Sequence, residues 1–272
     1  MLTKNFLFLG CGKMGLAMLK AILKNQEITH SQIKIIKKTL SLNDESLKNK
    51  IDLYQEASLL PANYKADLIF LCVKPQDIND LLCKFIESGK ITEDSVFISI
   101  IAGKKINYFE KILGVKAKII RTMPNLAIET DNGILPYMTN DSIDNDLTMQ
   151  IMNLFKNSAN IFNIKDESLF DVITAIFGCG PGYIFLLQEI LAEIAVKNGL
   201  DENLSKKLIK KLFLGSAIMS NNSNDFAKSR KDVTSKKGVT QALIDSLQDN
   251  YSLKKIFNKA IDNAISRSKN LS

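Results

Sequence analysis

The stretch that decides the fold is Asn5-Phe-Leu-Phe-Leu-Gly-Cys-Gly-Lys-Met-Gly15. Its apolar run, residues 6–9, predicts a strand that is buried on both faces, and residues 16–24 have the spacing of a helix. Between them the glycines follow the pattern G-x-G-x-x-G, which permits a tight turn, the approach of a pyrophosphate and close packing of helix on strand. We therefore expect a dinucleotide site whose phosphates lie at the helix N-terminus, with a purely structural tight turn as the alternative. The residues expected to line this loop are Gly10, Cys11, Gly12, Lys13, Met14 and Gly15.

Length and composition describe an ordinary globular protein. The 272 residues are long for one hydrophobic core, so we expect two domains. Hydrophobic residues make up 46% and charged residues 24% of the chain. The net charge of +7 comes almost entirely from scattered lysines without interleaved aromatic residues, so we do not expect a nucleic-acid partner.

Cysteine and histidine usage argues against a metal site. The four cysteines form no C-x-x-C pair, and the single histidine has no cysteine or second histidine near it in the sequence. A reducing, cytoplasmic setting fits this pattern, and we expect no export because no basic region or cleavage site is evident at the start. The longest uncharged stretch, residues 172–188, contains three glycines and a proline, so we expect it to be too broken to cross a membrane.

Alternating strands and helices occupy the first part of the chain. Apolar runs predict strands at residues 32–36, 67–73, 96–101 and 117–121, and a helix at 78–88. Further edge strands are expected at 134–138 and 161–164, around a helix near 145–157. This alternation predicts an α/β fold with a doubly wound parallel sheet.

The end of the second strand bears on the choice of cofactor. An acidic residue there would bind the ribose 2′-hydroxyl of NAD, whereas a cation would accept the 2′-phosphate of NADP. The sequence offers Lys37, Lys38 and Thr39, and its first acid comes only at Asp44. We therefore expect NADPH, with NADH as the weaker alternative; a solvated lysine pair in a surface loop is the competing interpretation.

Beyond residue 165 the pattern becomes helical. We expect helices at 168–176, from Pro181 to about Asn198-Gly199, at 205–220 and at 243–268, with a polar turn over 232–241. The predicted division is thus 1–164 for dinucleotide binding and 165–272 for a helical domain. Because residues 172–196 are too apolar to face water, we expect at least a homodimer.

These motifs, in this order, resemble those of the pyrroline-5-carboxylate reductases. The match is carried by FLGCGKMG (8–15), VKPQ (73–76), RTMPN (121–125), DVITAIFGCGPGYIF (171–185) and VTSKKGVT (233–240), and it extends over nearly the whole chain. The resemblance implies an N-terminal Rossmann-type domain, a C-terminal all-helical dimerisation domain that interlocks between subunits, and a site between them. It also implies NADPH-dependent reduction of the small molecule 1-pyrroline-5-carboxylate to L-proline, by hydride transfer to the cyclic imine carbon.

The resemblance further implies roles for individual residues. Thr240 would hydrogen-bond the ring nitrogen, although a helix N-cap is the alternative role, and Lys74 would lie near the nicotinamide unless it is a solvated strand end. Substrate carboxylate binding would involve Ser235, Gly238, Val239, Gly180, Pro181 and Gly182. The remaining cofactor contacts would come from Val73, Lys74, Pro75, Ala102, Gly103, Met123, Pro124 and Asn125.

One loop departs from the family pattern. Where the family shows Ser-Pro-Gly-Gly-Thr/Ala-Thr, this chain has Ser235-Lys-Lys-Gly-Val-Thr240. If the replaced glycine needs a positive φ, Lys237 would be strained there, although two added cations suit a carboxylate. Two other functions therefore stay open: a cofactor-binding regulatory protein with a decayed substrate loop, and another NADP-dependent two-domain imine or hydroxyacid reductase.

Overall fold

The computed structural model describes residues 4–271 and divides into two compact units. The sheet unit consists of the chain up to Cys179 together with the residues from Ala264 onward, and the helical unit is Gly180–Asn263. The predicted domain ranges begin at residue 1 and end at residue 272, and residues 1–3 and 272 lie outside the described part.

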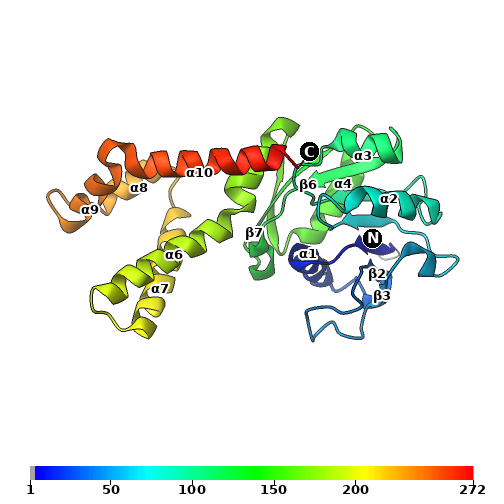
Figure 1. Ribbon diagram of the computed structural model, residues 1–272, viewed down its shortest axis with the longest axis horizontal. Helices are drawn as coiled ribbons and strands as arrows, with labels where there is room; N and C mark the ends of the chain where they lie inside the picture. Colours follow the sequence, from blue (N-terminus) through cyan, green and yellow to red (C-terminus); the bar gives the residue numbers. More distant parts are fainter. Residues whose placement is uncertain (1–3, 272) are drawn as a thin grey trace. The chain divides into compact units, whose positions relative to one another are not determined.

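An eight-stranded sheet forms the centre of the sheet unit (Figure 1). Its strands are β1 (Phe6–Leu9), β2 (Ile33–Ile36), β3 (Asp52–Tyr54), β4 (Leu68–Leu71), β5 (Val96–Ser99), β6 (Lys118–Thr122), β7 (Gly133–Thr139) and β8 (Ala159–Asn163). The order is β3-β2-β1-β4-β5-β6-β7-β8, in which the first six strands are parallel and β7 runs antiparallel to β6. The predicted doubly wound sheet is confirmed. The short strand β3 was not predicted from the sequence.

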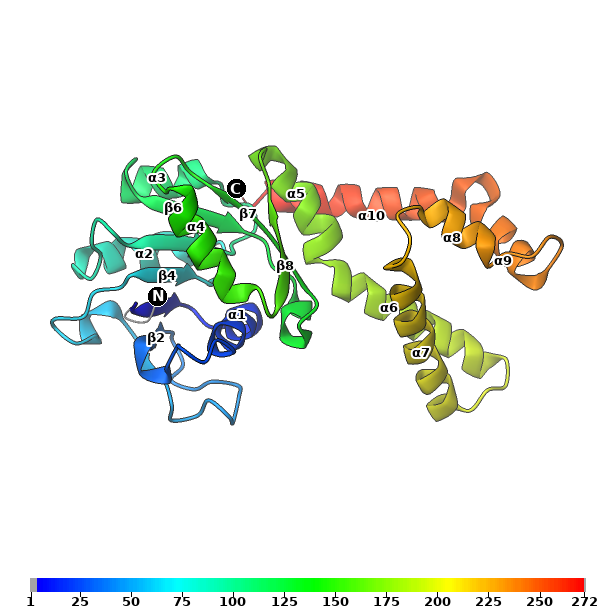
Figure 2. The ribbon, with the colours of Figure 1, turned by 180° about the vertical axis from the view of Figure 1, so that it is seen from behind.

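Helices cover both faces of this sheet (Figure 2). Alternation along β1 sends Phe6 and Phe8 into one core and Leu7 and Leu9 into the other, and all four side chains are fully buried. The first core includes residues of α1 (Lys13–Leu23) and α4 (Asn145–Met152), and the second includes residues of α2 (Ile78–Glu87) and α3 (Ile106–Leu113). Phe8 stacks on Phe70 of β4 with ring centroids 4.5 Å apart.

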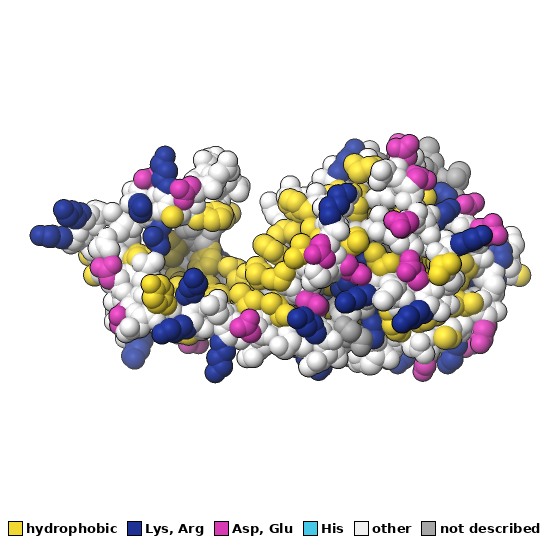
Figure 3. All heavy atoms as spheres, turned by 90° about the horizontal axis from the view of Figure 1, so that it is seen from above, with side chains coloured by type: hydrophobic (Ala, Val, Ile, Leu, Met, Phe, Trp, Pro, Cys, Tyr) yellow, Lys and Arg dark blue, Asp and Glu magenta, His cyan; other side chains and the backbone are white. Residues whose placement is uncertain are grey.

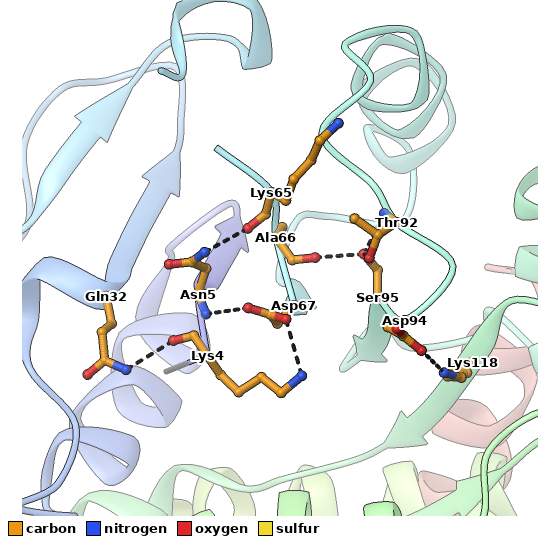
Figure 4. A network of polar contacts seen from close by, with 10 residues as sticks. All are labelled: Lys4, Asn5, Gln32, Lys65, Ala66, Asp67, Thr92, Asp94, Ser95 and Lys118. Carbon is orange, nitrogen blue, oxygen red and sulfur yellow. Dashed lines mark hydrogen bonds and ion pairs between the residues drawn. The ribbon is translucent and has the colours of Figure 1, made fainter. Parts of the chain in front are cut away.

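Polar contacts join the strands where they begin (Figure 4). The carboxylate of Asp67 accepts hydrogen bonds from the Asn5 backbone N–H at 2.7 Å and from the Lys4 ammonium at 3.2 Å. The Ser95 hydroxyl donates to the Ala66 carbonyl at 2.6 Å. Since parallel strands begin at the same edge, these contacts leave the opposite edge, at the strands' carboxyl ends, for ligands.

The helical unit contains α6 (Gly180–Lys197), α7 (Glu202–Ser220), α8 (Phe226–Asp232), α9 (Val239–Gln248) and most of α10 (Ser252–Lys269). The single helix predicted over 243–268 is wrong, because a 3-10 turn over Asp249–Tyr251 separates α9 from α10. Asn250 and Tyr251 have φ values of 48° and 58°, which no helix can continue. Helix α8 was not predicted.

A π-helical turn joins the two units through the backbone. Helix α5 (Phe170–Ile173) runs into the π-helical turn Thr174–Gly178 and then directly into α6, with the Cys179 N–H donating to the Thr174 carbonyl at 2.9 Å. The helix expected to begin at Pro181 begins one residue earlier, at Gly180, after a bend at Cys179. Taken as one run, Glu167–Lys197 is by length and composition alone long and apolar enough to cross a membrane, contrary to the expectation that it would be too broken.

The helical unit has almost no interior of its own. Within residues 180–263, all of which the structure describes, only Ser205 is buried. Large apolar side chains instead lie exposed along its helices, and Figure 3 shows them on its surface. The most exposed of these in α6 and α7 include Phe185, Leu186, Ile194, Leu212, Ile218 and Met219.

Candidate active site

The glycines of the dinucleotide loop differ in what surrounds them. Gly10 has a φ of +84°, and a Cβ there would lie 2.5 Å from Val73 Cγ1. A Cβ on Gly15 would lie 3.1 Å from the Cys72 Cβ, so these two positions need glycine for packing. A Cβ on Gly12 would meet nothing within 4 Å. The loop therefore leaves open space at the one glycine where the motif brings a pyrophosphate to the backbone.

The first turn of α1 presents free backbone donors at this space. Gly12 is the N-cap, no side chain caps the helix, and its first turn contains no acidic residue. Lys13 and Met14 open the helix, and their unsatisfied N–H groups and the helix dipole favour an anion here.

Two lysines follow β2 on the same edge of the sheet. Ile36 pairs with Leu9, so Lys37 emerges beside the glycine loop, and its ammonium donates to the Ser41 carbonyl at 2.5 Å. Burial raises the pKa of the Cys11 thiol in that loop to about 11, while the charge of Lys37 acts in the opposite direction.

Lys38 and Thr39 are more exposed to solvent than Lys37. The Lys38 side chain is 91% exposed, with its ammonium 3.4 Å from Asp77 Oδ1, and Thr39 is also exposed. The cationic end of β2 therefore exists as predicted, although Asp77 partly offsets it.

The segments after β4 and β5 contribute further predicted cofactor residues. Val73 touches the glycine loop, and Lys74 is exposed, with its carbonyl accepting the Asp77 N–H at 3.0 Å. Pro75 and Ala102 are half-buried. Gly103 is buried against the C-terminal segment of the chain.

A Cβ on Gly103 would lie 2.7 Å from the Ser268 carbonyl oxygen and from Leu271 Cβ. Ser268 is itself buried, and its hydroxyl lies 2.6 Å from Asp171 Oδ1. The contact with the end of α10 thus explains why residue 103 is glycine, and the sequence did not indicate it.

Met123, Pro124 and Asn125 are all buried behind the π-helical turn. A Cβ on Gly178 would lie 3.5 Å from Met123 Cγ. The Asn125 side chain accepts the Ile134 N–H at 3.2 Å and donates to the Phe177 carbonyl at 3.3 Å. The Met-Pro-Asn motif therefore packs against the π-helical turn.

A buried ion pair that the sequence did not reveal holds the helix just before this turn. Arg121 is 2% exposed, its Nη1 lies 2.9 Å from Glu167 Oε1, and its guanidinium lies 4.4 Å from the Phe170 ring centroid. The same Glu167 oxygen accepts the Ile106 N–H at 2.7 Å. The only signal for this pair was an arginine beside the Met-Pro-Asn motif.

The loop that differs from the family pattern, Ser235–Thr240, forms a tight turn at the start of α9. The Gly238 N–H donates to the Ser235 carbonyl at 3.0 Å, and Lys237 has a φ of 58°. A positive φ at the third position is the requirement of a type II turn, for which Pro-Gly is the favoured central pair. A Cβ on Gly238 would lie 2.2 Å from Ser235 Oγ, which can rotate away, and 3.0 Å from the Ser235 carbonyl oxygen, so this turn is tightly packed.

Thr240 follows in the first turn of α9. The N-cap is Gly238, so the alternative role of Thr240 as an N-cap is wrong. Val239 is 90% exposed and Thr240 is half-buried. Among residues 4–271 the Thr240 hydroxyl has no hydrogen-bond partner.

The first turn of α6 is also open. Gly180 and Pro181 are half-buried and Gly182 is exposed. A Cβ on Gly182 would meet nothing within 4 Å, and no acidic residue lies in this turn. This helix start can therefore receive an anion without a competing negative charge.

Fold and site together define a two-domain, dinucleotide-dependent oxidoreductase. A family model described as "NADP oxidoreductase coenzyme F420-dependent" matches residues 5–103, and one described as "Pyrroline-5-carboxylate reductase dimerisation" matches residues 167–271. The chain is 30% identical to the pyrroline-5-carboxylate reductase of Staphylococcus aureus (strain COL), over 97% of each chain. It belongs to the pyrroline-5-carboxylate reductase family, which confirms the resemblance.

Solved structures agree with this assignment. The pyrroline carboxylate reductase of Plasmodium falciparum, solved with NADP bound, is 27% identical, with a TM-score of 0.88 over 100% of this chain and 99% of that one. The pyrroline-5-carboxylate reductase of Coxiella burnetii is 28% identical, with a TM-score of 0.82 over 99% of each chain.

Proposed function

We propose that this chain reduces 1-pyrroline-5-carboxylate to L-proline with NADPH. The observation that carries the proposal is the match to a pyrroline-5-carboxylate reductase over 97% of both chains. An open dinucleotide loop and an intact turn before Thr240 support it. The NADP bound in the Plasmodium falciparum relative supports the choice of cofactor.

The sheet unit fits the cofactor. The open side of Gly12 and the N-terminus of α1 would receive the pyrophosphate, and Lys37 and Lys38 would hold the 2′-phosphate that NADH lacks. Lys74 would lie near the nicotinamide. When bound, NADPH supplies the hydride, and the protein supplies position and charge.

The helical unit provides groups for the substrate. The backbone N–H groups of the turn at Ser235–Gly238 and of the first turn of α9 would bind the carboxylate, with the Gly180–Gly182 helix start as a second set of donors. The unpaired Thr240 hydroxyl would hydrogen-bond the ring nitrogen. An imine nitrogen is protonated far more readily than a carbonyl oxygen, so this chemistry needs no dedicated histidine.

Assembly and location complete the proposal. The exposed apolar helices and the matched dimerisation family support a homodimer or larger assembly. The functional division at residues 164 and 165 is supported by the start of that family match at residue 167. We place the enzyme in the cytoplasm, where its four cysteines, all free, would stay reduced.

Turnover tests the proposal directly. NADPH absorbance should fall only when pyrroline-5-carboxylate is added, and proline should appear in equal amount. Reduction of a hydroxyacid's keto form but not of this imine would instead show a different reductase.

A further inference from the structure

Asn125 is a buried side chain that ties the Met-Pro-Asn motif to the π-helical turn by a hydrogen bond. It is 5% exposed and follows β6 at the carboxyl edge of the sheet. The side-chain Oδ1 of Asn125 accepts the Ile134 N–H at the start of β7, and the backbone N–H of Asn125 donates to the Ile134 carbonyl at 3.3 Å. Its Nδ2 donates to the Phe177 carbonyl.

The Phe177 carbonyl, near the end of the π-helical turn, cannot be bonded in the ordinary α-helical way. In an α-helix it would accept the N–H of residue 181, but residue 181 is proline and has none. A carbonyl that loses its helical donor is stabilised where another group takes over. The Asn125 amide, at 3.3 Å, is that group.

This arrangement also limits what else Asn125 can do. Its carbonyl oxygen is taken by Ile134, and one hydrogen of its amide is taken by Phe177. The side chain is buried between the sheet and the π-helical turn, so it is poorly placed to contact a cofactor directly.

We infer that Asn125 is a positioning residue for the reaction: it replaces the donor that Pro181 removes and so fixes the π-helical turn from which the Gly180–Gly182 helix start follows. The inference rests on the proposed function, in which that helix start binds the substrate carboxylate. The expectation from the family resemblance, that Asn125 contacts the cofactor, predicts a raised NADPH Kd instead.

Asn140 is a matched control in the same unit. It is also a buried asparagine, and it follows the other end of β7. Its Oδ1 accepts the Ile119 N–H at 3.0 Å, and its Nδ2 donates to the Ala117 carbonyl at 2.8 Å and to Glu110 Oε1 at 2.9 Å. Asn140→Asp therefore disrupts a similar network without touching the π-helical turn.

Asn125→Asp removes the donor while keeping the shape, and it should lower kcat/KM for the imine about tenfold while the NADPH Kd changes less than about twofold. Hydrogen exchange of a peptide covering residues 174–183 should become faster. Asn140→Asp, which places a carboxylate against Glu110, should change neither, even at a larger loss of Tm. A raised NADPH Kd in Asn125→Asp, or equal effects of the two variants, would overturn the inference.

A double-mutant cycle keeps the inference testable if Asn125→Asp folds poorly. Pro181→Ala restores an N–H opposite the Phe177 carbonyl, so Asn125→Ala should accelerate exchange in this peptide less in that background than in the wild type. Additive effects would contradict it. Because exchange needs no substrate, a wild type without turnover would refute the proposed function and leave this readout standing.

Discussion

The two units use a similar supply of apolar residues in opposite ways. Strand β1 buries all four of its side chains, whereas α6, over 18 mostly apolar residues, buries none. Neighbouring strands and helices of the same chain cover the sheet. Within residues 180–263, by contrast, Ser205 is the only buried residue, so these helices leave their apolar side chains exposed. The comparison teaches that the sheet unit has its own core, while the helical unit needs a second subunit to form one.

The largest effect should come from a charge on the exposed apolar helix. Phe185 is 64% exposed in the single chain, and Phe185→Asp should weaken self-association by about 3–5 kcal/mol, because a carboxylate would be buried without a partner. Light scattering over a dilution series measures the effect.

Met149 on α4 of the sheet unit is the control, since it is 52% exposed there. Met149→Asp should leave the assembly unchanged. Equal weakening by both substitutions, or a stable folded wild-type monomer at micromolar concentration, would contradict the conclusion that the helical unit needs a second subunit.

Alkaline pH should weaken the sheet unit selectively. Burial raises the Cys11 pKa to about 11, from 9.0 in an unfolded chain. Between these values only the unfolded state releases the proton, so stability present below pH 9 is lost as the pH rises to about 11, by roughly 2–3 kcal/mol. Hydrogen exchange at both pH values checks this. Cys11→Ala should reduce the dependence and leave the part due to Cys72, whose pKa burial also raises; residues 180–263 contain no cysteine.

Cofactor choice should depend on the sheet unit alone. Replacing Lys37 and Lys38 with glutamine should weaken NADPH binding by about 1–3 kcal/mol and leave NADH nearly unchanged. Titration calorimetry measures both. The same change at Lys48 and Lys50, exposed lysines of the following loop, serves as control. Equal losses for the two cofactors would show that the lysines are only a solvated pair.

Reduction of the substrate should depend on Thr240 in the helical unit. Thr240→Ala should lower kcat/KM by about 1–3 kcal/mol while NADPH binding stays intact, because it removes a contact to the ring and none to the cofactor. Ser246→Ala, farther along α9, removes a hydroxyl that already bonds the Ala242 carbonyl at 3.0 Å. It should have no such effect. A loss of NADPH affinity in Thr240→Ala would contradict the assignment.

The smallest effect concerns strain in the turn. Lys237 has a φ of 58°, so Lys237→Gly should relieve strain and change stability by less than about 1 kcal/mol, partly offset by the greater freedom of glycine when unfolded. Thermal unfolding measures it, and a large loss of stability would show that the lysine side chain has a stabilising contact.

The sequence was sufficient for the parts of the fold that local patterns determine. The strands β1, β4, β5 and β6 and the glycine loop follow from apolar runs and from G-x-G-x-x-G. The positive φ of Lys237 agrees with the conditional expectation for the glycine that it replaces, because this angle depends only on neighbouring residues.

Other features depend on contacts between distant segments. No local pattern shows that Asn125 lies beside Phe177, or that the end of α10 covers Gly103. The π-helical turn before Pro181 was missed for the same reason, because the Asn125 amide that bonds the Phe177 carbonyl lies far away along the chain.

The central claim is that this chain, with its altered loop, is an active reductase. The most direct measurement compares kcat/KM for pyrroline-5-carboxylate between the wild type and the double variant Lys236→Pro, Lys237→Gly. We expect the wild type to turn over and the variant to have an equal or lower KM, because the backbone of the turn binds the carboxylate in both. A wild type that binds NADPH without turnover, beside an active double variant, would contradict the claim and show that the substrate loop has decayed.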